Sequence, residues 1–251
     1  MAVRVLTDCA AYVGPYDFTT DVNECTLAME ADVKEKTTFN SGGWKEFIAG
    51  LRNVTTMHKG YWQSATSQAV DPQAFPDLGV PDRVHTFAPF EETPADPMIF
   101  TDQQMSTFYK GTKLAYTIGA TVGEITSFDL TSQGSSSSGL VHGSLIVPKR
   151  TVSGTGKVGV TWDSVFGIGS GTSLYVALHI TVPGTTITIQ VQSDDNTGFA
   201  SPTLLSTIGP LTTATDFWMA PVAGPIADRY IRLNVSAITG TFTLAASIGV
   251  R

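Results

Sequence analysis

The chain has 251 residues with a formal net charge of −7, and 42% of its residues are hydrophobic while only 15% are charged. That length allows one large or two small domains and suffices to bury a hydrophobic core. No run of lysines or arginines occurs, which argues against a protein that binds nucleic acid by neutralising phosphates. No stretch approaches the roughly 18 consecutive apolar residues of a membrane-spanning helix, so no membrane partner is expected. The low charge predicts that much of the surface forms interfaces.

Residues 1–10 lack the apolar run of a secretory signal peptide, and this predicts a protein that is made in a cytosol. The two cysteines, Cys9 and Cys25, lie in strand-like contexts near the N-terminus. Because disulfides require an oxidising compartment, both are expected to be reduced thiols.

Residues 24–34 form the clearest alternating pattern in the first half of the chain. Apolar residues occupy the odd positions from 25 to 33, and most even positions are polar or acidic. This period of two predicts a half-buried strand. Its acidic side chains most simply form a solvated face, and the alternative is a row that faces a lumen or a neighbouring subunit. The acidic residues of this row are Glu24, Glu30 and Asp32.

The stretch from Thr37 to Trp62 reads as a strand end, a short helix near residues 42–52 and a second strand. Asn40 and Ser41 are side chains of the kind that cap a helix. The apolar residues that follow have the i, i+3, i+4, i+7 spacing of one helical face, and such a helix needs a sheet to cover. The predicted contact between helix and sheet consists of Trp44, Phe47, Ile48 and Leu51.

Residues 63–82 contain several prolines and few periodic apolar residues, which predicts a loop or a short helical excursion. Residues 98–109 fit either a strand or a helix. Four more strands are expected at 83–90, 112–120, 123–130 and 140–147.

After residue 150 the composition changes, because only 9 of the remaining 101 residues are charged while Ser, Thr and Gly increase. Short alternating strands separated by turns predict an antiparallel sandwich. The clearest of these strands are 174–182, 187–191, 230–237 and 241–250.

The predicted fold class is therefore mainly β. Residues 1–150 are expected to form an antiparallel β-sandwich or barrel with one short flanking α-helix. Residues 151–251 are expected to form a C-terminal antiparallel β-sandwich.

Residues that could carry chemistry are scattered. The four histidines have no metal-ligand spacing, and no G-x-S-x-G nucleophile motif occurs. Asp194, Asp195 and Asn196 supply adjacent oxygen atoms that could begin a calcium site, but most Asp-rich turns bind nothing. The sequence therefore predicts no enzyme, no catalytic residue, no cofactor and no bound metal.

Two tryptophans in the second half, Trp162 and Trp218, admit two interpretations. They could form a platform on which a sugar stacks, which would suit a carbohydrate-binding or adhesin-type β-sandwich. They could equally belong to the core of the sandwich, and this second interpretation is favoured.

The order of patterns from residue 15 to 65 resembles the tail tube (major tail) proteins of long-tailed bacteriophages. It runs from an alternating strand through T-T-F and small polar residues to W-x-x-F-I-x-G-L, a strand and G-Y-W. The resemblance extends loosely to about residue 150. The residues that carry it are Thr38, Phe39, Trp44, Phe47, Gly50, Leu51, Gly60 and Trp62.

This resemblance implies a structural virion protein that forms rings stacked into a hollow tube, through which viral DNA passes without specific binding. The implied partners are further copies of the chain and other tail proteins, such as the tape measure, the tail terminator and the baseplate or tip. Assembly is expected in the host cytoplasm. By position, the segments 63–82 and 91–110 are candidates for loops that bridge one ring to the next, with Gln68, Pro72, Phe75, Pro76 and Pro81 in the first segment.

Two arrangements of the C-terminal half remain open at this stage. It is either a decoration domain on the tube wall or a second tube-like half. The first arrangement corresponds to a ring of six chains, and the second to a ring of three chains with two modules each.

Overall fold

The computed structural model describes residues 8–38, 42–66, 69–90, 104–165 and 167–251. The fold is mainly antiparallel β, as predicted, with one short helix. The chain divides into two compact units that are not contiguous in sequence. The sandwich unit consists of Met1–Thr20, Arg83–Tyr109 and Val141–Arg251, and the arm unit consists of Asp21–Asp82 and Lys110–Leu140.

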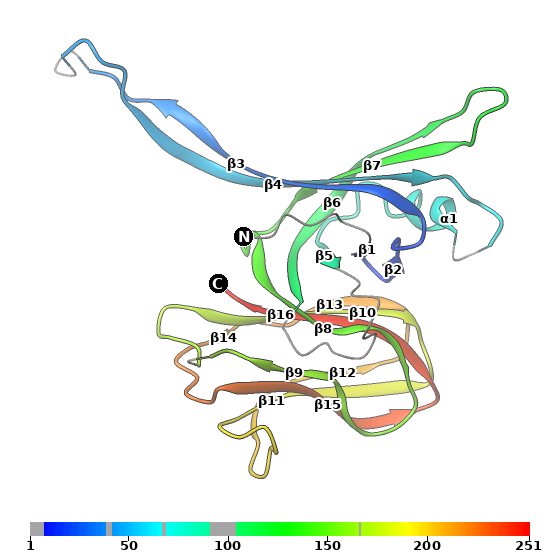
Figure 1. Cartoon of the computed structure of the whole chain (residues 1–251), viewed down its shortest axis with the longest axis vertical. Helices are drawn as coiled ribbons and strands as arrows, with labels where there is room; N and C mark the ends of the chain where they lie inside the picture. The colour runs from blue at the N-terminus through cyan, green and yellow to red at the C-terminus, as the bar shows by residue number, and fades with distance from the viewer. Residues whose placement is uncertain (1–7, 39–41, 67–68, 91–103, 166) are drawn as a thin grey trace. The chain divides into compact units, whose positions relative to one another are not determined.

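The sandwich unit contains two sheets (Figure 1). The strand order of the first is β13-β10-β16-β8-β6-β5-β1-β2, with β14 also beside β10, and the order of the second is β12-β11-β15-β9. The strands are β1 (Asp8–Val13), β2 (Tyr16–Asp17), β5 (Arg83–Phe90), the start of β6 (Met105–Gly119), β8 (Val141–Val152), β9 (Gly156–Asp163), β10 (Ser173–Val182), β11 (Thr186–Asp194), β12 (Thr203–Leu211), β13 (Thr215–Trp218), β14 (Val222–Ala223), β15 (Tyr230–Thr239) and β16 (Phe242–Val250).

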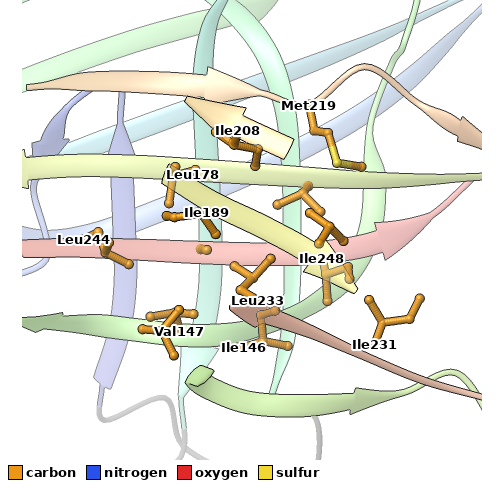
Figure 2. Packing of buried hydrophobic residues seen from close by; sticks show 14 of the residues in the cluster. Ile146, Val147, Leu178, Ile189, Ile208, Met219, Ile231, Leu233, Leu244 and Ile248 are labelled. Atoms are coloured by element: carbon orange, nitrogen blue, oxygen red, sulfur yellow. The ribbon is translucent and has the colours of Figure 1, made fainter. Parts of the chain in front are cut away.

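The core of this unit lies between β8, β10 and β16 of the first sheet and the strands of the second sheet. Figure 2 shows apolar side chains from both sheets meeting, among them Leu178 of β10, Ile189 of β11 and Leu244 of β16. These three residues are completely buried. The alternation that predicted the strands explains this, because every second side chain of a strand points to the same face.

The arm unit is built on an antiparallel sheet of order β3-β4-β7-β6. A segment that contains the helix covers one face of this sheet, where Val70 and Ala74 are fully buried. At Gly60, strand β4 passes close to the backbone of Asp21. A Cβ at this position would collide with the carbonyl oxygen of Asp21, so only glycine fits. The elements are β3 (Val22–Glu35), β4 (Phe47–Tyr61), α1 (Val70–Ala74), the remainder of β6 and β7 (Ser127–Gly134).

Strands β3 and β4 extend beyond this sheet as a long two-stranded hairpin (Figure 1). Strand β7 pairs with β4 only from Thr55 to Tyr61. The β3–β4 ladder continues as far as the pair Glu35 and Phe47. We call this projecting part, residues 29–38 and 42–54, the arm.

The helix predicted near residues 42–52 is wrong. Gly42 and Gly43 lie in a turn with φ of 60° and 85°, and Phe47 begins strand β4. The predicted contact with a sheet is absent too, because the exposed fractions are 80% for Trp44, 55% for Phe47, 50% for Ile48 and 81% for Leu51. A β-bulge near Gly50 shifts the register between β3 and β4. This bulge interrupts the alternation of β4, so the apolar residues of this segment matched a helical spacing instead of a strand pattern. The neighbouring strand β3 then provides a ladder that outweighs local helical periodicity.

The structure also places the division of the chain elsewhere than residue 150. That residue lies inside strand β8, and Arg150 pairs with Leu244 of β16. Residues 1–20 and 83–109 belong with the C-terminal sandwich. A cut at residue 150 would therefore break a strand in the middle of a sheet.

Candidate assembly surface

The arm has one face that is mostly apolar. Directly opposed residues of an antiparallel pair share a face, and the register pairs Met29 with Val54 and Val33 with Ala49. Near the body of the arm unit the same face of β4 is buried, with Val54 only 6% exposed. Farther out it is open, because Met29 is 59% exposed and Val33 is 67% exposed. The apolar face thus continues past the point where the described part of the chain covers it.

The opposite face of β3 carries the predicted acidic row. Glu24, Glu30 and Asp32 are all exposed in the structure. Glu24 forms an ion pair with Lys59 at 3.2 Å, and Asp32 forms one with Lys34 at 3.5 Å. Such exposed pairs contribute about 0–1 kcal/mol each. The row is solvated in the single chain, and its role in a lumen or at a subunit contact stays a prediction.

The outer end of the arm is held by charged pairs across the hairpin. Lys45 Nζ lies 3.2 Å from Glu35 Oε2, and Lys36 Nζ lies 3.4 Å from Glu46 Oε2. The backbone N–H of Lys36 donates to the carbonyl of Glu46 at 2.9 Å. Trp44, between these pairs, is 80% exposed. The end of the arm therefore exposes the Trp44 ring beside two ion pairs, Lys45–Glu35 and Lys36–Glu46.

The segment 63–82 folds back over the arm unit. Pro72 lies inside α1 and is exposed, as are Phe75, Pro76 and Pro81, and Phe75 is 67% exposed. Gln68 lies outside the described residues, as do residues 91–103 of the second candidate loop. The ring-bridging role predicted for these segments stays a prediction.

A buried lysine that the sequence analysis missed ties this segment to the sheet. Lys113 of β6 is completely buried, and its Nζ lies 3.3 Å from Asp77 Oδ2 and 3.4 Å from the carbonyl oxygen of Gln73. Its backbone carbonyl accepts the N–H of Gly79 at 2.9 Å. No local signal distinguishes this lysine from the exposed ones, because its burial depends on residues about 40 positions away in sequence.

Two further polar groups lie on the same face of the sheet, the buried side chain of His58 and the carboxylate of Asp71. Burial and the nearby charge of Lys113 lower the pKa of His58 to about 4. Asp71 Oδ1 accepts hydrogen bonds from the Trp62 indole N–H at 3.2 Å and from the Tyr116 hydroxyl at 3.0 Å. Burial and this carboxylate raise the pKa of Tyr116 well above its usual range. These groups anchor the covering segment rather than present reactive atoms.

A second apolar surface lies at the other end of the arm unit's sheet, where β6 turns into β7 (Figure 1). Three large apolar side chains are exposed there. We call this surface the β6–β7 end. Its residues and exposed fractions are Ile118 47%, Val122 103% and Ile125 72%. Leu114, which is also exposed, lies at the other end of the β6–β7 ladder, level with Thr56 and Met57 of β4.

In the sandwich unit the two tryptophans do not form an open platform. Trp162 is 8% exposed and belongs to the core cluster, which confirms the favoured interpretation for that residue. Trp218 is partly buried, and its ring centroid lies 5.6 Å from that of Phe108 and 5.6 Å from that of Tyr175.

His179 of β10 is a structural residue of the same unit. Its Nδ1 lies 2.7 Å from the carbonyl oxygen of Gly14 and must donate, because a carbonyl oxygen only accepts. Its Nε2 then accepts the hydroxyl of Thr86 at 2.8 Å. Burial lowers the pKa of this ring, so the neutral form suits both hydrogen bonds.

The turn at Asp194 satisfies its own backbone. The Asp194 carboxylate accepts the N–H groups of Asn196 at 2.9 Å and Ser201 at 3.1 Å. In the described part of the chain, no group of three or more His, Cys, Asp or Glu side chains could hold a metal ion. No helix among the described residues is long and apolar enough to cross a membrane.

No family model and no curated protein matches this chain. Among solved structures, a chain from the virion of a native gene transfer agent (GTA) particle aligns with a TM-score of 0.40 and 15% identity, over 54% of this chain and 96% of its own. A chain from the tail of an empty GTA particle aligns with a TM-score of 0.34 and 17% identity, over 47% and 79% of the two chains.

The Dit protein (gp 19.1) of phage SPP1, described as a paradigm of the hub adsorption apparatus in phages that infect Gram-positive bacteria, aligns with a TM-score of 0.34. Identity is 11%, and the alignment covers 96% of this chain and 98% of that one. At these TM-scores and identities the likenesses do not establish a shared fold.

Proposed function

We propose that this chain is a structural protein of a phage tail, and that its copies assemble into rings that stack into the hollow tail tube. The observation that carries the proposal is the arm, whose apolar side chains are not covered by any of the described residues. The pattern of residues 15–65 that resembles tail tube proteins supports the same assignment, although its expected helix is a hairpin instead.

The chemistry of the arm favours a protein contact over solvent. Contiguous exposed apolar patches beyond roughly 300–600 Å² are rare on soluble monomers and usually mark interaction sites. Burying such surface stabilises a contact by about 25 cal/mol per Å². On its apolar face the arm exposes Met29, Val33 and Phe47, while Ile48 and Leu51 are exposed on the opposite face and Trp44 near the turn.

The edges of the sheet support assembly as well. Among the described residues β3 pairs with β4 alone, so one edge of this 14-residue strand has no neighbouring strand in the described part of the chain. Free edges of this length invite pairing with other chains. A repeated contact whose rotation closes gives a ring, and a ring would cover this edge in every copy.

The charge of the chain suits a passage for DNA. A net charge of −7 and an exposed acidic row on β3 would repel a polyanion rather than bind it. The proposed partners are other copies of the chain and other tail proteins, including the tape measure, the terminator and the baseplate or tip. The proposed location is the virion after assembly in the host cytoplasm, and the role requires no cofactor and no catalysis.

For the sandwich unit we favour a decoration role over a second tube-like half. Its strands close their own core, which contains 22 buried residues. A unit with a complete core can hang on a tube wall without contributing strands to it. A ring of six chains is therefore expected rather than a ring of three.

Negative-stain electron microscopy of the full-length protein over a range of concentration and salt tests this function. We expect rings or tubes with six-fold symmetry from the wild type and monomers from a Trp44→Ser/Phe47→Ser/Leu51→Ser variant. A matched control is Leu204→Ser, which removes an apolar side chain that is 53% exposed in the sandwich unit and should assemble normally. Single rings that never stack would assign a hub position instead of a tube. A wild type that stays monomeric throughout would overturn self-assembly.

A further inference from the structure

We infer that the sandwich unit binds an acidic polysaccharide on the outer face of its second sheet, through a set of side chains that we call the donor face. Strands β9, β11, β12 and β15 form this sheet as one layer of the unit (Figure 1). Its inner face, with Ile189 and Leu233, packs into the core, so the alternate side chains lie on the outer face. The donor face consists of Gln190 and Gln192 of β11, Arg232 and Asn234 of β15, and Lys157 of β9.

The register of the strands brings these five side chains together. Directly opposed residues of an antiparallel pair share a face. Gln192 is opposite Arg232, and Gln190 is opposite Asn234. Asn234 is in turn opposite Lys157 of β9. The two rows adjoin, because side chains two positions apart on a strand point to the same face, and the result is one contiguous polar patch.

Arg232 is held in place at this patch. Its Nε–H donates to Gln192 Oε1 at 2.9 Å, and its Cζ lies 4.2 Å from the centroid of the Phe199 ring. Phe199 is only 6% exposed, so the ring is a fixed support. Arginine can stack on an aromatic ring while its fork of donors matches a carboxylate. Because the guanidinium is already positioned, little freedom is lost when its terminal nitrogens bind a ligand.

The hydrogen bonds of the patch have one possible direction. A guanidinium only donates, so the Gln192 amide must turn its oxygen to Arg232 and its NH2 group to Gln190. Gln192 Nε2 then donates to Gln190 Oε1 at 2.9 Å, which leaves the NH2 group of Gln190 at the far end. Among the described residues, neither this NH2 group nor the terminal nitrogens of Arg232 have a hydrogen-bond acceptor. Both ends of the network therefore offer donors, and a ligand has to supply the acceptors.

The charge and polarity of the face select the ligand. Arg232 and Lys157 are the cations of the patch, and Asp194, the acidic residue of β11, already accepts two backbone N–H groups of its own turn. Of the large apolar side chains in this sheet, Leu204 alone is exposed, so the face lacks the apolar patch typical of a protein contact. Cations and donors without apolar surroundings fit a ligand rich in carboxylates and hydroxyls. A polysaccharide that contains uronic acids has this chemistry.

Calorimetric titration of the full chain with polygalacturonate at low salt tests the site. The variants are Arg232→Met and Lys157→Met, and the matched control is Arg150→Met, which removes an exposed arginine from β8 in the first sheet. Arg232→Met is expected to weaken binding at least about 10-fold, because hydrogen bonds between charged groups are the strong ones. Lys157→Met should weaken it by about 3-fold, as for an exposed ion pair. Arg150→Met should bind as the wild type does.

Dextran, a neutral polysaccharide, should not bind, and added salt should weaken the complex with polygalacturonate. A wild type that does not bind polygalacturonate, or that binds dextran equally well, would overturn the inference. So would an equal loss of binding in Arg150→Met, since net charge alone would then explain it.

The thermal midpoint of each variant guards against a loss of fold. Wild-type binding by Arg232→Met at an unchanged midpoint would overturn the inference. If the midpoint of Arg232→Met falls, Lys157→Met decides, because its side chain is exposed: weaker binding supports the site, and unchanged binding overturns it. The formation of rings or tubes is observed separately by electron microscopy, so failure of this site and failure of the proposed function are distinguishable.

Discussion

Strand β3 of the arm and the core strands of the sandwich unit have the same alternating pattern, but their apolar side chains differ in burial. Leu174, Val176 and Leu178 of β10 are completely buried, whereas Met29 and Val33 of β3 are 59% and 67% exposed. In β10 a second sheet of the same chain covers the apolar face. In the arm no part of the described chain covers it. A period of two therefore states that one face of a strand is to be buried, and it does not state which chain does the burying.

The effect of a substitution therefore depends on whether the side chain is buried by its own chain or exposed in the single chain. Changes inside either unit should lower the stability of the monomer. Changes on the arm should leave the monomer intact and remove assembly.

The largest loss of stability is expected from Lys113→Met in the arm unit. Asp77 would lose its buried ion pair at 3.3 Å, and breaking a buried pair from one side costs about 3–5 kcal/mol. Urea unfolding followed by tryptophan fluorescence would measure this loss. A double variant, Lys113→Met/Asp77→Leu, is the control and should recover much of the stability, since neither charge is then left behind. Equal stability of Lys113→Met and the wild type would show that this pair does not hold the segment.

A comparable loss in the sandwich unit is expected from Leu178→Ala. The residue is completely buried between the sheets, and removing such a side chain costs about 2–5 kcal/mol through lost burial and the cavity left behind. Denaturant unfolding followed by tryptophan fluorescence gives the value. If Leu178→Ala cost no more than a surface substitution, the core described for this unit would be incorrect.

Acid should weaken the arm unit through His58. Its folded pKa of about 4 lies below the ordinary value of about 6.5, so the folded state resists the proton that the unfolded state accepts. The full stability is present above pH 6.5 and declines as the pH falls toward 4, by up to about 3 kcal/mol. Amide hydrogen exchange of β4 and β7 between pH 7 and 4 would follow it.

His58→Phe is the variant that sharpens this comparison, because it removes the titrating group from the arm unit alone. Its exchange rates in β4 and β7 should lose most of their dependence on protonation of the protein. His179, whose pKa is also lowered by burial, would still make the sandwich unit sensitive to acid. An unchanged pH dependence in the arm unit of His58→Phe would assign the effect to another group.

The smallest effect on monomer stability is expected from Leu51→Ser on the arm. The side chain is 81% exposed, and surface substitutions usually change stability by less than about 0.5 kcal/mol. Unfolding at low protein concentration would test this, with assembly of the same sample measured at high concentration. A loss of monomer stability several-fold larger than about 0.5 kcal/mol would mean that the arm packs against its own chain.

The sequence predicted the strands of the sandwich unit closely. The expected strands 174–182 and 241–250 correspond to β10 (Ser173–Val182) and β16 (Phe242–Val250). Both have strict alternation between turn residues, and both pack against other strands of the same chain. Local pattern and tertiary environment agree there, so the pattern alone sufficed.

The sequence failed where two periodicities competed. Trp44, Phe47, Ile48 and Leu51 fit one helical face, yet the segment from Phe47 pairs with β3. The bulged, exposed strand β4 keeps no alternation across its bulge, so its residues carry no reliable strand signal, unlike those of β3. The exposure of these side chains, from 50% to 81%, is the feature that now marks the candidate assembly surface.

By itself, the sequence determined that the chain is mainly β, that its second half is a sandwich, and that no group of residues has the spacing of a catalytic or metal site. These properties follow from composition and short-range periodicity. Only the tertiary structure decided how the chain divides, because residues 1–20 and 83–109 join the sandwich through pairings with distant strands. It alone also buried Lys113 against Asp77 and left the arm's apolar face open. Burial is set by what lies across a face, and for these residues the neighbours are far away in sequence.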